Sequence, residues 1–384
     1  MPNVNDIANL AEALEKHPVI VVVDRCVAVR NRNATCRKCV QACPFDALKV
    51  EANELSLDAT SCVGCGACIG VCPTEALISA ELPDNALSAA AIKALENADG
   101  VGVIACARIS SKHLADPEKY VEVSCLACVD ESIIVELVAQ GASSIMLVDG
   151  VCKTCKYRDC VACVEDAMDQ ARLVIHAGGS TCTVERASSF PDELLIEDAT
   201  GMFGSTRRGF FSDAVGAARE TAMVAAKTTI EQELGMKVQE PSIGERLRVT
   251  KSGSLPTIDA PRHDRLLNAF DALGGQVGDQ LDSRKFATVS IDSDKCNSCG
   301  MCAVFCPTGA LRRDESQASS DPISFIEFSA SECVNCLLCK DVCWKGALTL
   351  EKGVSFEQLY DFEPRVFHMQ NSRKQNSPFG AFGL

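Results

Sequence analysis

The chain has 384 residues, 24 of them cysteine, and a formal net charge of −15 at pH 7. This negative charge disfavours a nucleic-acid partner, because phosphates are bound by clustered Lys and Arg. No stretch reaches the ~18 uncharged apolar residues of a membrane span, and residues 1–20 lack the basic and apolar regions of a secretory signal. We therefore expect a cytoplasmic protein with no direct membrane span, whose thiols are reduced and bind metal.

The first 80 residues are predicted to contain a short amphipathic helix and a compact cysteine-rich module. Apolar residues at helical spacing predict the helix over residues 1–19, and VIVVVD at 19–24 predicts a buried strand. Cys62 to Cys72 has the sequence CVGCGACIGVC and is followed by proline, which gives the spacing C-x2-C-x2-C-x3-C-P. Three thiolates of such a run bind one [4Fe–4S] cluster and the fourth binds a second cluster, as in bacterial ferredoxins.

The first half of this module is a truncated copy of the same run. Cys36, Cys39 and Cys43 match its second, third and fourth positions, whereas position 33 is Asn. We expect Cys26 to supply the missing thiolate by way of a polar loop. Two interleaved zinc knuckles are the alternative, although zinc sites rarely combine these spacings twice. The crossover rule predicts one cluster on Cys26, Cys36, Cys39 and Cys72, and a second on Cys62, Cys65, Cys68 and Cys43.

A helical linker at 81–98 leads to a central region in which strands and helices alternate. Such alternation predicts a parallel sheet that is covered by helices. Each predicted strand ends in a cysteine, at the edge where open parallel sheets bind ligands. The apolar runs are 100–106, 120–125, 143–152 and 171–182, the helical segments include 130–142 and 160–171, and the cysteines at the strand ends are Cys106, Cys125, Cys152 and Cys182.

Three stretches of this region resemble the small iron–sulfur (delta) subunit of methyl-viologen-reducing hydrogenase. They are ACARI at 105–109, SCLACVDESIIVELVAQGASSIMLVDG at 124–150 and CKTCKY at 152–157. That subunit couples hydrogenase or formate dehydrogenase to heterodisulfide reductase and holds a [2Fe–2S] cluster. The resemblance implies a fifth cluster here, and Cys128, which stands where the family has Arg, would suit a [4Fe–4S] instead. The implied ligands are Cys106, Cys125, Cys128, Cys152 and Cys155.

The central cysteines also admit other interpretations. Cys155, Cys160 and Cys163 have the C-x4-C-x2-C spacing of plant-type [2Fe–2S] ferredoxins, whose fold is mostly β. Structural zinc on Cys125, Cys128, Cys152 and Cys155 is a further possibility. A single one of these residues can also be a small buried hydrophobe.

The last part of the chain carries a second dicluster module. Residues 201–280 contain no cysteine and are predicted to form helices, one of about 207–234 and a shorter one at 262–274, which brace the modules. The run at 296–306 repeats the full ferredoxin spacing, and the run at 333–343 repeats it with Trp344 in place of proline. We expect a third cluster on Cys296, Cys299, Cys302 and Cys343, and a fourth on Cys333, Cys336, Cys339 and Cys306.

The fold class we expect is therefore α+β and multidomain, with two ferredoxin-like dicluster modules that flank an α/β parallel-sheet domain. The expected parts are an N-terminal helix (1–19), the first dicluster module (20–80), a helical linker (81–98), the α/β cysteine-rich domain (99–190), a bracing region (191–284), the second dicluster module (285–352) and a C-terminal tail (353–384).

The function we expect is electron transfer within an anaerobic oxidoreductase complex. The chain has no glycine-rich nucleotide loop and no obvious acid–base pair, so it needs redox partners at both ends. We expect these to be a flavoprotein, a hydrogenase, a formate dehydrogenase or a subunit like heterodisulfide reductase, and the chain itself to be non-catalytic. One alternative is a reductase with substrate or disulfide chemistry at the central cysteines. Another is a redox sensor or scaffold with central structural zinc.

Overall fold

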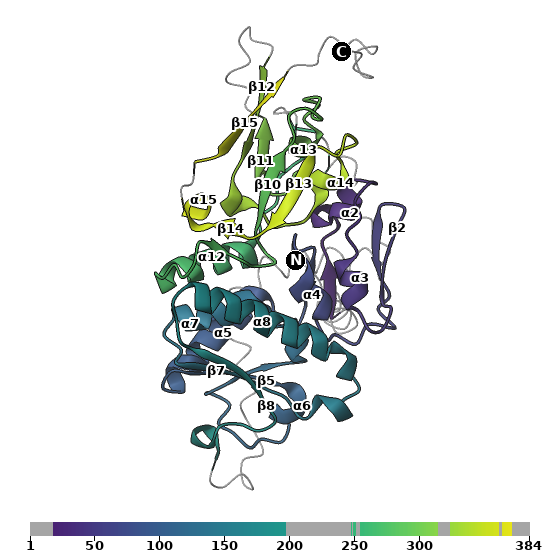
Figure 1. The fold of residues 1–384 in the computed structure, drawn as a ribbon. Coiled ribbons are helices and arrows are strands. Elements are labelled where there is room, and N and C mark those ends of the chain that lie inside the picture. The colour runs from purple at the N-terminus through teal and green to yellow at the C-terminus, as the bar shows by residue number, and fades with distance from the viewer. Residues whose placement is uncertain are drawn as a thin grey trace, which may run out of the picture. The chain divides into compact units, whose positions relative to one another are not determined.

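The computed structural model describes residues 18–196, 247, 249–250, 254–313, 323–360 and 363–370. Their contacts divide the chain into two compact units, coloured along the chain in Figure 1. The first unit contains residues 18–23, 37–196 and 261–277, and the second contains residues 24–36 and the described residues of 247–260 and 278–370. The helices predicted at 1–19 and at 207–234 lie outside the described residues, apart from 18 and 19.

The first unit begins with the first cysteine-rich module, a small arrangement of short helices and antiparallel strand pairs. The strands are only three or four residues long, and the cysteines lie in the segments between them. Val19 pairs with Ser79 and Leu48 with Leu57. The elements are β1 (Val19–Val21), α3 (Lys38–Ala42), β2 (Leu48–Glu51), β3 (Glu54–Leu57), α4 (Ala67–Val71) and β4 (Leu77–Ser79).

The same unit contains a four-stranded parallel sheet with the order β6-β5-β7-β8, which agrees with the predicted α/β domain. Helices α7 and α8 lie against the same face of this sheet (Figure 1). Gly102 of β5 leaves room for the side chain of its strand neighbour, because a Cβ atom there would lie 2.5 Å from Cδ1 of Ile145 in β7. The elements are α5 (Asp84–Asn97), β5 (Val101–Cys106), α6 (Ala107–Ser110), β6 (Val121–Val123), α7 (Glu131–Ala139), β7 (Ser144–Val148), α8 (Val161–Ala177) and β8 (Thr183–Ala187).

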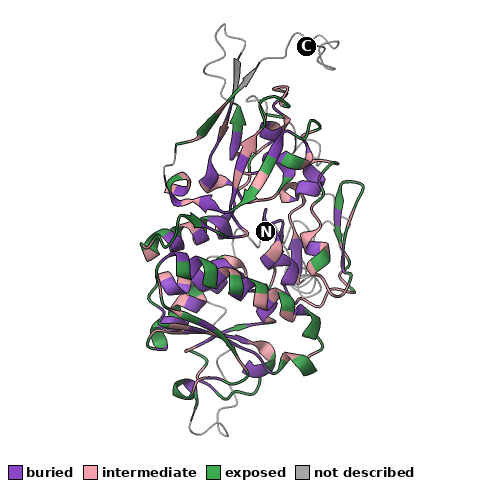
Figure 2. Cartoon of the chain, in the orientation of Figure 1, coloured by how far each residue is buried: buried purple, intermediate pink, exposed green. Residues whose placement is uncertain are grey.

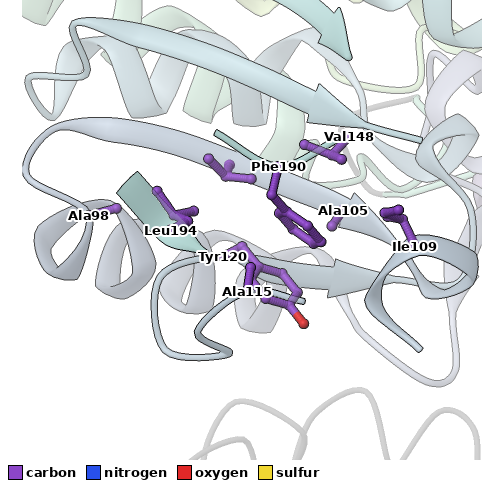
Figure 3. Close-up of a cluster of buried hydrophobic side chains, with 9 residues drawn as sticks. Ala98, Ala105, Ile109, Ala115, Tyr120, Val148, Phe190 and Leu194 are labelled. Carbon is purple, nitrogen blue, oxygen red and sulfur yellow. The ribbon is translucent and has the colours of Figure 1, made fainter. Parts of the chain in front are cut away.

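On the face of the sheet away from α7 and α8, the buried side chains form an apolar cluster that includes Val103, Ala105 and Val148. The rings of Tyr120 and Phe190 pack in it with their centroids 4.8 Å apart, as the close-up shows (Figure 3). Figure 2 shows the central strands as largely buried. Burial on both faces explains why these strands are continuous apolar runs rather than alternating ones.

Helix α12 (Pro261–Leu273), the short helix predicted at 262–274, packs against α7 in the first unit. Its Arg262 is only 1% exposed and lies beside two carboxylates, with Nε 3.6 Å from Glu75 Oε2 and 3.4 Å from Asp84 Oδ2. The guanidinium also donates to the carbonyl of Ile69, and the Arg262 backbone N–H donates to Glu75 over 2.9 Å. Burial alone would lower the pKa of Arg262, but the charges of Asp84 and Glu75 raise it.

The second unit holds the second cysteine-rich module. Its main antiparallel pair, β10 with β13, matches Ala287 with Lys352, and a three-stranded sheet has the order β11-β12-β15. The elements are α2 (Val27–Arg30), β9 (Gln280–Leu281), β10 (Ala287–Ile291), α13 (Met301–Val304), β11 (Leu311–Arg313), β12 (Ile323–Phe328), α14 (Leu338–Asp341), β13 (Leu348–Lys352), β14 (Val354–Ser355), α15 (Phe356–Tyr360) and β15 (Arg365–Gln370).

Two expectations about local structure are wrong. Residues 171–182 do not form a strand, because 171–177 continue α8 and Gly179, with φ +74°, lies in the turn that follows. Cys182 therefore precedes β8 rather than following a strand. In addition, much of the segment expected to be a tail from 353 forms β14, α15 and β15, and β15 pairs with β12. No helix among the described residues is long and apolar enough to cross a membrane.

We expect Arg262→Ala to lower the free energy of unfolding by about 3–5 kcal/mol, because it leaves the buried Glu75 and the half-buried Asp84 without their counter-charge. Asp169→Ala is the matched control, since it removes an exposed ion pair, Asp169–Arg172, and should cost less than about 1 kcal/mol. Urea unfolding of the purified protein, followed by far-ultraviolet circular dichroism, measures both. Equal losses in the two variants would contradict the structural role of Arg262.

Candidate metal centres

The three complete cysteine runs share one backbone shape. In each, the residue before the second cysteine and the residue after it have left-handed backbone angles, which turn the loop sharply around a central point. Glycine adopts this conformation readily, but Ser298, Asn335 and Leu337 occupy three of the six positions. The residues and their φ angles are Gly64 +71°, Gly66 +73°, Ser298 +58°, Gly300 +71°, Asn335 +49° and Leu337 +66°.

In the second unit, the four cysteines expected to hold the third cluster lie near one another. Burial, together with the charges of Cys299, Cys296 and Cys343, raises the pKa of Cys302 to about 12. Burial also raises the pKa of Cys296, again with contributions from Cys299 and Cys343. Cys343 is the fourth cysteine of a different run, and it lies near the first three cysteines of the Cys296 run, as the crossover rule predicts.

The cysteines expected to hold the fourth cluster line one pocket of the second unit. Cys306, Cys333, Cys336 and Cys339 contribute to its wall, together with apolar side chains such as Val289 and Phe328. Burial, with a contribution from the charge of Cys306, raises the pKa of Cys333 to about 12. Four thiols around an apolar pocket suit a cubane, because each thiolate binds a different iron atom.

The first module shows the same grouping for its second set. Burial raises the pKa of Cys62, and the charges of Cys65 and Cys43 add to the shift. Burial raises the pKa of Cys68 strongly, with contributions from Cys65 and from Cys39, which is assigned to the other cluster of the module. In the second module, the charge of Cys302 likewise contributes to the raised pKa of Cys339, although the two are assigned to different clusters.

The fourth cysteine of each complete run accepts a hydrogen bond from the backbone that follows it. Ala76 donates to Cys72 over 3.3 Å, Leu311 to Cys306 over 3.4 Å and Ala347 to Cys343 over 3.3 Å. Hydrogen bonds to cysteine sulfur stabilise the thiolate and raise the reduction potential of a bound cluster. Trp344, which replaces the proline in the last run, is 66% exposed and adjoins Lys345, so it does not cover the site as a buried ring would.

The remaining predicted set, Cys26, Cys36, Cys39 and Cys72, comes from both units. Cys26 and Cys36 belong to the second unit, whereas Cys39 and Cys72 belong to the first. Cys26 directly precedes α2 and is 8% exposed, as are Cys39 and Cys72. Each thiol is free of disulfide bonds.

Residues 24–36 are fastened to the second module by several polar contacts. The backbone N–H and hydroxyl of Thr35 both donate to Asp341 Oδ2, over 2.7 and 2.9 Å. Arg30 is 5% exposed and donates to the carbonyl of Pro256 over 2.7 Å. The charge of Cys36 contributes to the raised pKa of Cys336. A cysteine of the first run therefore lies close to the site of the fourth cluster within the second unit.

Arg30 lies beside that site. Burial lowers the pKa of its guanidinium, while the charges of Cys306 and Cys336 raise it. Its Nε is buried and has no hydrogen-bond partner in the part of the chain that the structure describes. A buried donor next to two thiolates is the arrangement that a cluster with a net negative charge satisfies. The donor set, the pocket and this nitrogen thus fit a [4Fe–4S] cluster.

A further group of cysteines joins the first module to the parallel sheet. The thiol of Cys160, at the start of α8, lies near Cys65 and Cys125. Interaction with Cys160 lowers the pKa of Cys65 to about 7 and also lowers that of Cys125, whereas the pKa of Cys160 is raised. Cys128 adjoins the group, because a Cβ atom on Gly66 would lie 2.3 Å from its Cβ.

The structure distributes the other central cysteines more widely. Cys152 donates a hydrogen bond to Asp149 over 3.3 Å, and the charge of Cys125 contributes to the raised pKa of Cys152. Cys106 ends β5, and Cys155 follows a 3₁₀ turn and accepts a hydrogen bond from the backbone N–H of Tyr157. Cys163 belongs to α8, so the mostly β surroundings of a plant-type cluster are absent there. In the described ranges, no three His, Cys, Asp or Glu side chains are arranged to hold a single metal ion.

Comparison with known proteins identifies both cysteine-rich modules. Residues 32–76 and 282–347 match the family of 4Fe-4S dicluster domains. A ferredoxin of Mycolicibacterium smegmatis is 37% identical over 57 residues, which are 15% of this chain and 49% of that protein. A 7Fe ferredoxin of Hydrogenibacillus schlegelii is 30% identical over 57 residues, 15% of this chain and 67% of that protein. The chain thus spans about half of the first relative and two thirds of the second.

We expect Arg30→Gln to make the reduction potential of the cluster site at Cys306 and Cys336 more negative. Losing a buried positive charge beside the thiolates should lower it by about 60 mV or more, the one-electron equivalent of ~1.4 kcal/mol. Redox titration followed by electron paramagnetic resonance measures the change. Arg30→Lys, which keeps the charge, should shift it less, and Arg32→Gln, at an exposed position of the same segment, should leave it unchanged. A potential that does not respond to Arg30→Gln would refute this electrostatic role.

Proposed function

Because this chain belongs to the ferredoxin family through its two 4Fe-4S dicluster domains, we propose that it is the electron-transfer subunit of an oxidoreductase complex. In this proposal, four [4Fe–4S] clusters supply one-electron redox chemistry. The single observation that carries the proposal is the crossing over of cysteines between runs. Cys343 lies with the Cys296 run, and Cys306 lines the pocket of the Cys333 run.

The ligand sets that we propose are those expected from the spacing. Three of them are supported by mutual charge interactions among their sulfurs. The remaining set depends on Cys26, which lies outside the matched segment 32–76. The sets are Cys26, Cys36, Cys39 and Cys72; Cys62, Cys65, Cys68 and Cys43; Cys296, Cys299, Cys302 and Cys343; and Cys333, Cys336, Cys339 and Cys306.

The chain's own residues then shape the route of the electrons. Cys39 and Cys68, which we assign to different clusters, lie near each other in the first module, and so do Cys302 and Cys339 in the second. Cys36 lies near Cys336 within the second unit. Apolar walls such as Val289 and Phe328 exclude water from the thiolates and thereby favour the less charged state of a bound cluster.

The partners in this proposal are redox proteins at both ends of the chain. The resemblance of residues 105–157 to the small hydrogenase subunit favours hydrogenase, formate dehydrogenase or a heterodisulfide-reductase-like protein. The expected fifth cluster on Cys106, Cys125, Cys128, Cys152 and Cys155 stays a prediction. The proximity of Cys160 to Cys125 favours a second candidate function, reductase or disulfide chemistry at the central cysteines.

Anaerobically purified protein should contain about 16 iron and 16 sulfide per chain if four cubanes are bound, and more if a fifth cluster is present. Cys26→Ala should remove about four of these irons, because it deletes one ligand of the first set. Cys182→Ser is the matched control, since Cys182 belongs to no run and should leave the iron content unchanged. Four intact cubanes in Cys26→Ala would show that our assignment of the first set is wrong.

The role as a subunit predicts that the isolated chain accepts electrons from a chemical reductant but converts no substrate alone. Affinity purification from the native cells, followed by mass spectrometry, should recover a flavoprotein or another redox enzyme in stoichiometric amount. Reduction of a low-molecular-weight substrate by the isolated chain would instead favour the enzymatic alternative.

A further inference from the structure

The carboxyl edge of the parallel sheet has an exposed loop with a strong positive charge. Residues 150–158, which follow β7, contain the exposed cations Lys153, Lys156 and Arg158 and no carboxylate. Arg108, which follows β5 at the same edge, is also exposed and adds a fourth cation. The chain as a whole has a net charge of −15. This basic loop is therefore a local reversal of the sign of the protein's charge.

The carboxylates that flank the basic loop do little to neutralise it. Asp149, just before the loop, is 4% exposed and is paired with Arg186, with Oδ2 3.1 Å from Nε. Asp159, just after the loop, is exposed. One exposed carboxylate thus stands beside four exposed cations, so the loop presents a net positive surface to an approaching molecule.

Hydrogen bonds hold the basic loop in one shape. Val151 has φ +69°, a left-handed conformation that is unusual for a β-branched residue. Its N–H donates to Asp149 Oδ1 over 2.8 Å, and its carbonyl accepts from Arg108 over 3.0 Å. Arg108 also donates to the hydroxyl of Thr154 over 2.9 Å. Gly150 gives Arg108 room, because a Cβ atom there would lie 3.1 Å from its Cγ. A loop that is already ordered loses little conformational freedom when it binds a partner.

One end of the basic loop lies against the first cysteine-rich module, within the first unit. The ring of Tyr157 meets that of Phe45 edge to face, with centroids 6.0 Å apart and an interplanar angle of 90°. Phe45 is two residues beyond Cys43, which we assign to the second cluster. The Nζ of Lys156 lies 4.6 Å from the centroid of the Tyr157 ring. The positive surface is therefore next to a segment that supplies a proposed cluster ligand.

We propose that residues 150–158 dock a small one-electron carrier protein through an acidic surface on that carrier, and that electrons cross between it and the second cluster. The proposal rests on the function proposed above, because it needs a cluster on Cys62, Cys65, Cys68 and Cys43. In each encounter one electron leaves a [4Fe–4S]⁺ cluster, which becomes [4Fe–4S]²⁺, and enters the redox centre of the carrier. Neither protein makes or breaks a covalent bond, and the reverse transfer reduces the cluster.

The charge and the position of the basic loop select this class of partner. The rest of the chain is acidic and repels an acidic protein, so the encounter is steered to the loop. Val151, 47% exposed among the cations, supplies an apolar contact at the centre of the surface. An anionic membrane would also match the charge, but the contact between Tyr157 and Phe45 beside Cys43 favours a redox protein.

The affinity of the oxidised holoprotein for an acidic flavodoxin, a one-electron flavin carrier, tests the docking. Anaerobic titration calorimetry gives the dissociation constant. We expect it to rise about tenfold when the three cations of the loop are neutralised, because three exposed ion pairs together are worth about that factor. Added salt should weaken wild-type binding and have less effect on this variant. The variant is Lys153→Gln/Lys156→Gln/Arg158→Gln.

A second triple variant is the matched control. It removes the same total charge at positions outside the loop, so its dissociation constant should stay within about twofold of the wild-type value. The single change Lys153→Gln should weaken binding less than the triple variant but in the same direction. The control variant is Lys93→Gln/Lys119→Gln/Lys352→Gln.

Stopped-flow mixing of the reduced holoprotein with oxidised flavodoxin tests the transfer of electrons. The flavin gains one electron and takes one proton from water, and its absorbance reports the rate. We expect the second-order rate constant to fall about tenfold in the loop variant at low salt. Cytochrome c, a basic one-electron acceptor, should react no more slowly with this variant than with the wild type.

The iron content separates the two levels of the proposal. Equal affinity of wild type and loop variant for flavodoxin, with full iron content in both, would overturn the docking site but leave the proposed function intact. Binding to vesicles that contain phosphatidylserine, with no binding to flavodoxin, would overturn it in favour of a membrane. Wild-type protein without iron would instead refute the proposed function itself.

Discussion

The buried guanidinium of Arg262 is the interaction on which the first unit depends. It contacts Glu75 just after α4 and Asp84 at the start of α5, and it donates to the backbone of α4 at Ile69. Both carboxylates need this cation, because a buried charge without a partner is strongly destabilising. Through it, α12 holds the first cysteine-rich module against the helices of the parallel sheet. The meeting of Cys65, Cys125 and Cys160 requires that alignment.

Electrostatics also distinguish the two modules. The pocket of the fourth set has an arginine, Arg30, beside its thiols, whereas the second set has the thiol of Cys160 near Cys65, where it lowers the pKa of Cys65. A nearby positive charge and a nearby donor both favour the more negative state of a cluster, but by different amounts and with different dependence on pH. Clusters with the same cysteine spacing can therefore differ in potential because of residues that lie outside the runs.

The spacing of the cysteines predicted the modules because a ferredoxin loop is a local structure, with ligands two or three residues apart. The sheet was predicted for a similar reason, since strands buried on both faces are continuous apolar runs. Residues 171–177 were assigned wrongly because a buried helical turn has the same composition as a buried strand. The proximity of Cys160 to Cys65 and Cys125 could not be predicted, because packing alone brings these three segments together. The left-handed backbone of Leu337 could not be predicted either, because a positive φ is expected at glycine and not at leucine.

Residues 24–36 belong to the second unit although the chain around them builds the first, and this has a consequence for biosynthesis. Thr35 bonds to Asp341, 306 positions further along. At ribosomal rates of about 5–20 residues per second, that partner is made roughly 15–60 s later. During this interval Cys26 and Cys36 lack the module against which they pack. A cluster on the proposed set of Cys26, Cys36, Cys39 and Cys72 would therefore be completed only when the polypeptide is nearly finished.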